Sequence, residues 1–441
     1  MADHAVSSDP RVQAQLDRLS MLSPGADILG LERISTLLAR LGNPETRLPP
    51  VFHVAGTNGK GSVCAYLRAA IEAAGYSAHV FTSPHLVRFN ERIRVAGRLI
   101  EDDLLAELLA EVLDVGQDVG ASFFEVTTAV AFLAFARTPA DACVIEVGLG
   151  GRLDATNVLP SPVVCGIAQL GIDHQAFLGD RIEDIAAEKA GISKRDVPLV
   201  TLHYPALLAN RVGQAAALAG ANWMPKGSTW DASAYQERLH YRDEQGKLDL
   251  PLPRLPGAHQ AINAGLAVAM LRHQTALTIP PAALRAAMGW ADWPARLQRL
   301  DGDLAALLPA GSELWLDGLH NPAAARAIAD FFRTTARPGH PFHLVLGLLE
   351  NKDPVGVLKP FVGRADSVQT VVVPGHAHHA PALLARLADK VGMIAHPAES
   401  VSAALTRIAR EAEPGSQPVV LIGGSLYLAG RVLVEDGSIP N

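Results

Sequence analysis

The chain has 441 residues, 49% of them hydrophobic and 5% aromatic, which is enough for two or three domains with aliphatic cores. Its formal net charge of −7 argues against a nucleic-acid or anionic-membrane partner, because proteins that bind these surfaces are usually basic. The three cysteines have no CxxC spacing, and neither a signal-peptide pattern nor an apolar stretch of ~18 residues occurs, so we expect a cytoplasmic protein with reduced thiols.

The N-terminal part of the chain alternates between helices and apolar strands. Apolar residues at helical spacing predict a helix around residues 12–19 and a second helix at 31–41. A short strand at 51–54 follows, then a glycine-rich turn at 55–62 and a helix that Gly75 closes. Further strands are expected at 79–81, 143–147, 163–168 and 198–202, and further helices at 104–113, 126–136 and 182–190. Apolar strands separated by helices indicate a parallel sheet covered on both faces.

The second half of the chain begins with a segment of a different kind. Residues 227–256 are polar and weakly periodic, which favours short antiparallel strands, and an Ala-rich helix follows at 258–271. Beyond Pro294 the alternation restarts, with strands expected at 313–316, 342–347, 368–373 and 418–422. We therefore predict an α/β protein with a P-loop-type parallel-sheet ATPase domain at 1–294 and a smaller Rossmann-like α/β domain at 295–441.

Residues 56–62, GTNGKGS, are the most informative segment, and we call them the phosphate loop. They follow a strand and open a helix, where backbone N–H groups and the helix N-terminus can surround phosphate oxygens. Lys60 can reach the β- and γ-phosphates as a point charge. The match to GxxxxGK[ST] is imperfect, since Val54 replaces the first glycine and Gly61 displaces Ser62 by one position. The predicted ATP contacts here are Thr57, Asn58, Gly59, Lys60, Gly61 and Ser62.

This departure from the usual pattern resembles the nucleotide loop of the Mur ligase and folylpolyglutamate synthase superfamily. Other segments resemble the motifs of its folate branch, in family order along nearly the whole chain. They are TSPHL at 82–86, NERI at 90–93, FEVT at 124–127, EVGLGGRLDATN at 146–157, DH at 173–174, EKAG at 188–191, HQAIN at 259–263, RLQ at 296–298 and DGLHNP at 317–322.

The resemblance implies an ATP-dependent ligase that converts a carboxylate to an acyl phosphate, which the amine of L-glutamate then attacks. It implies dihydropteroate and reduced folates as acceptors and a monomeric enzyme. Asp154-Ala155 after GGRL resembles the bifunctional bacterial form. Mg²⁺ is expected on Ser83, Glu146 and His174, and Lys189 is expected to be carbamylated. The catalytic residues implied are Lys60, Lys189 and His174.

The remaining contacts implied by the resemblance involve both predicted domains. Asn263 is expected at the adenine, and Arg296, Asp317 and His320 are expected to reach the nucleotide from the second domain across a cleft. Phe124 suits stacking on a flat heterocycle, and Asp154 suits hydrogen bonds to its amino groups. The full set expected at the pterin is Asp27, Ile28, Ser122, Phe123, Phe124, Glu125, Leu153, Asp154 and Ala155.

The sequence is compatible with three other functions. The chain can be a folylpolyglutamate synthase without dihydropteroate activity, or a Mur-type ligase for a UDP-linked peptide, although only 55 residues precede the phosphate loop. It can also be a nucleotide-dependent switch that ligates nothing.

Two other local motifs are not assigned a function. His376, His378 and His379 have metal-like spacing without acidic or cysteine companions, so we expect no metal there. Gly423-Gly424-Ser425 lacks GxGxxG spacing and is interpreted as a strand–helix turn.

Overall fold

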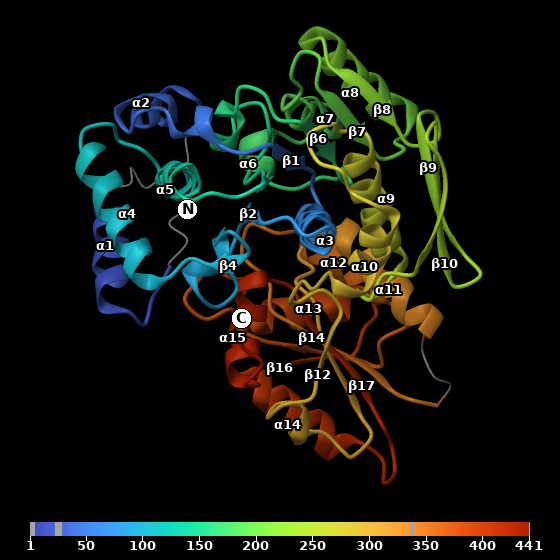
Figure 1. Cartoon of the computed structure of the whole chain (residues 1–441). Helices are drawn as coiled ribbons and strands as arrows, with labels where there is room; N and C mark the ends of the chain where they lie inside the picture. The colour runs from blue at the N-terminus through green and yellow to red at the C-terminus, as the bar shows by residue number, and fades with distance from the viewer. Residues whose placement is uncertain (1–4, 23–28, 336–338, 441) are drawn as a thin grey trace. The chain divides into compact units, whose positions relative to one another are not determined.

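A computed structural model describes residues 5–22, 29–335 and 339–440 and divides the chain into two compact units (Figure 1). Unit 1 comprises Met1–Arg254 and His259–Asp292, and unit 2 comprises Leu255–Ala258 and Trp293–Asn441. Each unit contains its own sheet and its own hydrophobic core. The expected α/β class is confirmed.

Unit 1 is built on an eight-stranded sheet in the order β4-β3-β2-β5-β1-β6-β7-β8. Its strands are β1 (Val51–Ala55), β2 (Ala78–Phe81), β3 (Ile93–Val95), β4 (Arg98–Leu99), β5 (Ala142–Glu146), β6 (Val164–Ile167), β7 (Pro198–Thr201) and β8 (Asn222–Pro225). All pairings are parallel except those of β3 and β4, an antiparallel edge hairpin that the sequence analysis missed. Every residue of β1, β2, β5 and β6 is buried, which is why these strands are continuously apolar.

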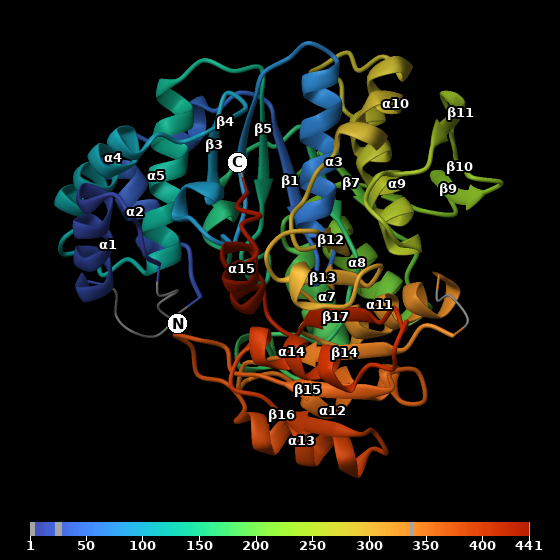
Figure 2. The ribbon, with the colours of Figure 1, turned by 90° about the horizontal axis from the view of Figure 1, so that it is seen from below.

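Helices cover both faces of this sheet. From β1 the chain crosses to β2 in one direction and returns to β5 in the other, so right-handed crossovers put the intervening helices on opposite faces. On one face α1 (Pro10–Leu22), α2 (Glu32–Arg40), α4 (Asp102–Val115) and α5 (Phe123–Arg137) share a core with the sheet, and Figures 1 and 2 show them grouped together. The phosphate loop leads into α3 (Lys60–Ala73), and α6 (Gln175–Leu178), α7 (Ile182–Ala190) and α8 (Ala206–Ala219) follow later strands.

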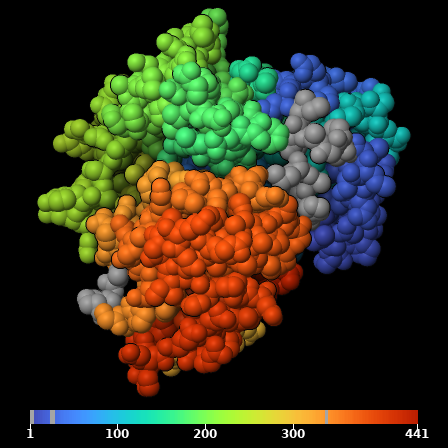
Figure 3. Space-filling view, turned by 180° about the vertical axis from the view of Figure 1, so that it is seen from behind, coloured from blue at the N-terminus to red at the C-terminus, as the bar shows by residue number. Residues whose placement is uncertain are grey.

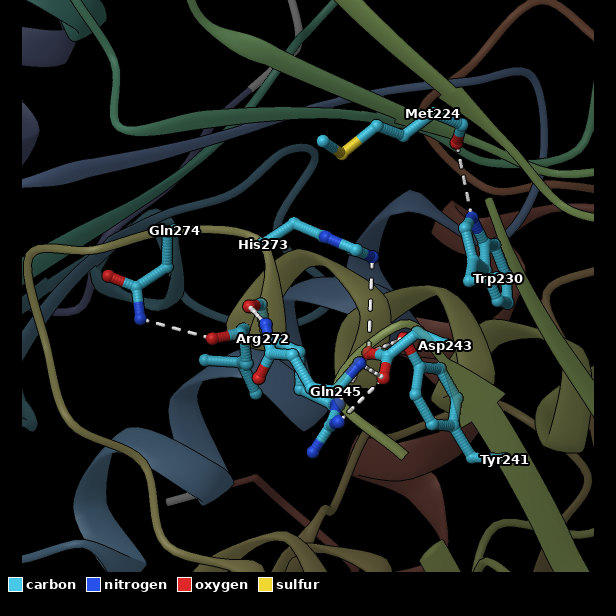
Figure 4. Close-up of polar contacts among 9 residues, drawn as sticks. Met224, Trp230, Tyr241, Asp243, Gln245, Arg272, His273 and Gln274 are labelled. Carbon is cyan, nitrogen blue, oxygen red and sulfur yellow. Dashed lines mark hydrogen bonds and ion pairs between the residues drawn. The ribbon is translucent and has the colours of Figure 1, made fainter. Parts of the chain in front are cut away.

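A small antiparallel sheet, as expected for this segment, joins β8 to the next helices. It consists of β9 (Trp230–Tyr235), β10 (Arg238–Asp243) and β11 (Gly246–Pro251), followed by α9 (Ala258–Arg272) and α10 (Pro281–Trp290). The side chain of Asp243 is fully buried and accepts two 2.6 Å hydrogen bonds from Arg272, at the end of α9 (Figure 4). Tyr241 also donates to Asp243, and Nε2 of His273 lies 4.0 Å from it. This buried cluster fixes the small sheet to α9.

Unit 2 repeats the α/β plan on a smaller scale, and its residues form one continuous body in Figure 3. Its sheet has the order β12-β13-β17-β14-β15-β16, parallel except for β12. The strands are β12 (Gln298–Leu300), β13 (Glu313–Leu316), β14 (Phe342–Leu346), β15 (Ser367–Thr370), β16 (Ala395–Pro397) and β17 (Val419–Gly423). The helices are α11 (Pro322–Thr335), α12 (Pro354–Leu358), α13 (Pro381–Lys390), α14 (Val401–Glu411) and α15 (Leu426–Glu435).

The three cysteines, Cys64, Cys143 and Cys165, are free thiols buried in unit 1. Burial raises the pKa of each thiol above its ordinary value. Among the described residues, no helix has both the length and the apolar character needed to cross a membrane.

Candidate active site

The phosphate loop lies at the carboxyl end of β1, where ligands bind in open α/β sheets. Its first part is tied to the segment after β6, because the carbonyl of Gln169 accepts hydrogen bonds from the N–H groups of Thr57 and Asn58. The hydroxyl of Thr57 adds a 2.9 Å bond to the carbonyl of Gly171. Gly59, with φ 87°, is the N-cap of α3 and has no side chain to satisfy the first-turn amides. Those amides, from residues 60–62, therefore remain available to an anion.

Lys60 begins α3, and its ammonium nitrogen lies 3.9 Å from Oε1 of Glu146 at the end of β5. The two side chains are only 17% and 5% exposed. Because β1 and β5 are neighbours in parallel register, their carboxyl ends meet at one edge of the sheet. The structure thus brings a lysine and a carboxylate, predicted from separate motifs, to the same place. A buried carboxylate beside a cation and a phosphate-binding turn suits metal–nucleotide chemistry.

The glycine turn after β5 packs closely on two helices. A Cβ atom on Gly148 would lie 2.3 Å from the ring of Phe124, and one on Gly151 would lie 2.7 Å from the carbonyl oxygen of Glu188 in α7. The carboxylate of Glu188 also accepts hydrogen bonds from Arg152 and from the N–H of Leu153. The glycines of this motif are therefore needed for close approach of the turn to its neighbours.

Asp154 is buried, and both of its carboxylate oxygens accept hydrogen bonds from within the chain. One accepts from the N–H of Leu149 and the other from the N–H and hydroxyl of Thr156. Burial raises the pKa of Asp154, although these bonds oppose the rise. Its predicted bonds to a pterin would be added to this internal network.

His53 and Thr156 extend the network to β1, and the sequence analysis missed both. Nε2 of His53 lies 2.9 Å from the hydroxyl of Thr156, which donates its single proton to Asp154. Nε2 of His53 must therefore donate, so the neutral ring carries its proton there. Burial and the charge of Lys194 lower the pKa of His53 to about 3, consistent with a neutral ring. A histidine within a buried strand, separated by 103 positions from its partner, gives no motif to search for.

Lys189 lies in the last turn of α7 and is almost completely buried. Burial, followed by the charge of Lys60, lowers the pKa of Lys189 to about 7, against the opposing effects of Asp173, Asp154 and Glu188. A lysine that is neutral near pH 7 is a nucleophile, which an ordinary solvated lysine is not.

The three predicted metal ligands follow three strands of the same sheet. Ser83 comes after β2, Glu146 ends β5 and His174 comes after β6, all at the carboxyl edge. His174 has a left-handed backbone, with φ 54°, at the start of α6. In the described parts of the chain, no three His, Cys, Asp or Glu side chains are grouped to hold a metal. Two such side chains and a hydroxyl still suit Mg²⁺, which usually keeps waters and phosphate oxygens as its other ligands.

The predicted pterin residues on α5 include a capping box. Ser122 is the N-cap and bonds Glu125 in both directions, while Arg33 donates a 3.0 Å hydrogen bond to Glu125. Phe123 is buried with its ring edge-to-face against Phe89, whereas Phe124 is partly exposed over the glycine turn. Leu153 is partly exposed as well, and Ala155 is buried. Asp27 and Ile28 lie outside the described residues.

Asn263 belongs to unit 1, whereas the other predicted nucleotide contacts of the second half belong to unit 2. Asn263 is buried on α9 beside Gly59. In unit 2, Asp317 directly follows β13 and accepts hydrogen bonds from the N–H groups of Leu297 and Leu319. Burial raises the pKa of Asp317, which Arg296 opposes.

The backbone around Arg296 is strained. Ala295 and Leu297, on either side of it, have φ values of 55° and 45°, a region that residues other than glycine rarely adopt. The side chain of Arg296 donates to the carbonyl of Ala295, and Nδ1 of His320 lies 2.9 Å from the carbonyl oxygen of Gly318. Such strain persists when the surroundings enforce it, and it is concentrated at functional sites.

The histidines at 376, 378 and 379 have contacts within unit 2. His378 contacts the carbonyl of His376, and His379 contacts that of Lys352. The ring of His376 stacks on Tyr427 with 3.8 Å between centroids. These contacts account for the three side chains as parts of the fold.

The chain is similar to several known proteins. A family model of the dihydrofolate synthetase C-terminal domain matches residues 303–435. The folylpolyglutamate synthase of Lacticaseibacillus casei is 33% identical over 91% of this chain and 92% of its own length. The structure of Escherichia coli FolC in complex with DHPP and ADP is similar with a TM-score of 0.87 and 31% identity, over 97% of both chains.

A second solved structure is that of a bifunctional folylpolyglutamate synthase/dihydrofolate synthase with Mn, AMPPNP and L-glutamate bound. It matches with a TM-score of 0.84 and 30% identity, over 97% of this chain and 98% of its own. Because the sequence similarity extends along almost the whole chain, the chain belongs to the dihydrofolate synthase/folylpolyglutamate synthase family.

Proposed function

We propose that this chain is an ATP-dependent ligase that joins L-glutamate to dihydropteroate, giving dihydrofolate, and to reduced folates, giving polyglutamates. The observation that carries the proposal is the convergence of the phosphate loop, Lys60 and Glu146 at one edge of the sheet. Family membership and the similarity to structures holding ADP, DHPP, AMPPNP and glutamate support the choice of substrates. In this proposal residues 1–294 bind ATP and the pterin, and residues 295–441 form the glutamate ligase domain of a cytoplasmic monomer.

The reaction needs two steps because a carboxylate oxygen is too poor a leaving group to be displaced by an amine. In the first step the acceptor carboxylate attacks the γ-phosphorus of ATP, and ADP leaves. In the second step the amine of glutamate attacks the acyl carbon, an amide bond forms, and phosphate leaves with the amine losing a proton. The first step brings two anions together, so Lys60 and the amides of residues 60–62 lower its barrier by offsetting that charge.

Mg²⁺ would be held by Ser83, Glu146 and His174, whose oxygen atoms and single imidazole suit an ion that shares its coordination with phosphates. When bound, the ion would neutralise phosphate charge. The ammonium group of Lys60 lies 3.9 Å from the carboxylate of Glu146, and the burial of both side chains reduces the screening of this pair by water.

Lys189 is buried in surroundings that favour a reaction of its amine with CO₂. A neutral amine adds CO₂ to give a carbamate and a proton, and a pKa of about 7 makes the neutral form abundant at neutral pH. The carbamate would convert a buried cation into an anion that can orient a second metal ion. Equilibration with ¹³CO₂ followed by carbon NMR of the native enzyme should show one carbamate resonance, and Lys189→Met should lose it.

The test of the proposed function is the acceptor dependence of ADP release. Purified enzyme with ATP and Mg²⁺ should release ADP when a pterin acceptor and glutamate are both present, and mass spectrometry should find the acceptor heavier by one glutamyl residue. Turnover without the acceptor would favour a nucleotide switch instead. Parallel assays with dihydropteroate and with tetrahydrofolate decide between the bifunctional enzyme and a folylpolyglutamate synthase alone.

A further inference from the structure

A chain of buried side-chain amides connects α9 to the phosphate loop. Nδ2 of Asn263 donates to Oε1 of Gln260, and Nε2 of Gln260 donates to the hydroxyl oxygen of Ser62, each over 3.3 Å. Ser62 and Gln260 are each 1% exposed, and Asn263 is 4% exposed. A buried amide placed between two polar partners is costly to replace with an apolar group, because both partners then lose a hydrogen bond.

At Gly59 the backbone of the phosphate loop packs closely against these side-chain amides. A Cβ atom there would lie 2.5 Å from Oδ1 of Asn263, and the φ of 87° also favours glycine. Helix α9 therefore lies directly against the loop at Gly59 and at Ser62. The contact connects the residue predicted at the adenine with the residues predicted at the phosphates.

The direction of the hydrogen bonds has a consequence for Ser62. A serine hydroxyl has one proton and two acceptor sites, and one acceptor site is used by the N–H group of Gln260. Its proton therefore does not point at Gln260 and can be donated elsewhere, such as to a phosphate oxygen. If the amide of Gln260 were absent, the hydroxyl would be free to rotate and its proton would lose this fixed direction.

We propose that Gln260 is a positioning residue for ATP: its amide, held by Asn263, orients the hydroxyl of Ser62 toward the bound phosphates. This proposal rests on the proposed function, since it assumes that the phosphate loop binds ATP. Gln260 itself need not touch the nucleotide. Its effect on catalysis is expected to pass through Ser62.

The test is a double-substitution cycle with Gln260→Met and Ser62→Ala, using ADP release with a folate acceptor and glutamate. We expect Gln260→Met to lower kcat/KM for ATP by about 10-fold, the scale of one oriented hydrogen bond, with KM for glutamate changed by less than about 2-fold. In the Ser62→Ala background the same substitution should change kcat/KM for ATP by less than about 2-fold. Equal losses in both backgrounds would overturn the proposal, because Gln260 would then act independently of Ser62.

Gln274→Met is the matched control, because Gln274, which Figure 4 labels, is another buried glutamine. It bonds only backbone groups of residues 271 and 277. The substitution should lower the melting temperature without a selective rise in KM for ATP. Gln260→Leu replaces Gln260→Met if the latter does not fold. If the wild-type enzyme itself releases no ADP with acceptor and glutamate, the proposed function fails. If the wild type is active and Gln260→Met matches it, the role of Gln260 fails.

Discussion

At the residue scale, Lys60 contributes its charge to the phosphate loop from a mostly buried position beside Glu146. We expect Lys60→Ala to lower kcat by about two to three orders of magnitude, because one oriented charge-stabilising group in a water-excluded site has an effect of this size. Circular dichroism should show an unchanged fold, and a coupled ADP assay measures the rate. Lys247→Ala, an exposed lysine of β11, is the control. A Lys60→Ala enzyme with the wild-type rate would refute the role of the loop.

Lys189 predicts a specific pH dependence of activity. Its pKa of about 7 means that it becomes charged as the pH falls below neutrality, so kcat should decline there, and Lys189→Arg, a permanent cation, should be inactive at every pH. A pH–rate profile between 5.5 and 9 checks this. A profile of Lys189→Arg parallel to that of the wild type would contradict it.

The same residue predicts how stability changes with pH. The folded pKa of about 7 lies below the ordinary value of 10.5, so between these pH values the unfolded chain binds more protons than the folded chain. The contribution of Lys189 to the free energy of unfolding must therefore rise with pH through this window. Urea unfolding in bicarbonate-free buffer at pH 6.5 and pH 9 should show a larger gain for the wild type than for Lys189→Met. An equal gain would mean that Lys189 is not shielded as described.

The sequence predicted residues with recognisable motifs better than residues that act through contacts. Lys60 and Glu146, from separate motifs, do meet, because parallel neighbours place their carboxyl ends together. Gln260 stood unremarked within a motif, since its partner Ser62 is 198 positions away. No spacing rule connects such pairs before the fold is known.

At the scale of elements, we expect the buried contact between Asp243 and Arg272 to hold the small antiparallel sheet to α9. Asp243→Ala should lower the free energy of unfolding by about 3–5 kcal/mol, because it leaves the largely buried charge of Arg272 uncompensated. Burial alone would raise the pKa of Asp243, but hydrogen bonds from Arg272 and Tyr241 keep it below its ordinary value. The carboxylate is thus ionised at neutral pH.

Urea unfolding measures this effect, and Asp249→Ala supplies the control. Asp249 pairs with His240 on the same small sheet but is 63% exposed, so its loss should change stability by less than about 1 kcal/mol. Similar effects of the two substitutions would show that burial does not strengthen the Asp243 pair.

The sequence pattern of apolar strands alternating with helices predicted most strands of both sheets, but it did not predict the strands at the sheet edges. The hairpin of β3 and β4 has strands of three and two residues that contain Arg94 and Arg98, too short and too polar for a pattern of strands. Strand β8 is partly exposed and ends in Pro225 at an edge of the sheet. Proline is tolerated there because it has no N–H group to donate to a neighbouring strand. Strands at a sheet edge are determined by the strands beside them in space rather than by a local sequence pattern. They could therefore not be predicted from the sequence.

At the scale of the whole molecule, unit 2 has a sheet and core of its own. We expect residues 293–441 expressed alone to unfold in one cooperative urea transition, since 149 residues is an ordinary domain length. Circular dichroism follows the transition, and the fragment should release no ADP because it lacks the phosphate loop. A gradual, non-cooperative loss of signal would indicate that unit 2 depends on unit 1 to fold.

The cysteines buried in unit 1 make the chain suited to site-specific dye attachment. A maleimide reacts with a thiolate at the surface, and Cys64, Cys143 and Cys165 offer neither exposure nor a low pKa. New surface cysteines, one introduced into each unit, can therefore carry a fluorescent donor and acceptor without prior removal of the native thiols. Energy transfer between the two dyes would then report, molecule by molecule, how the separation of the units responds to added nucleotide.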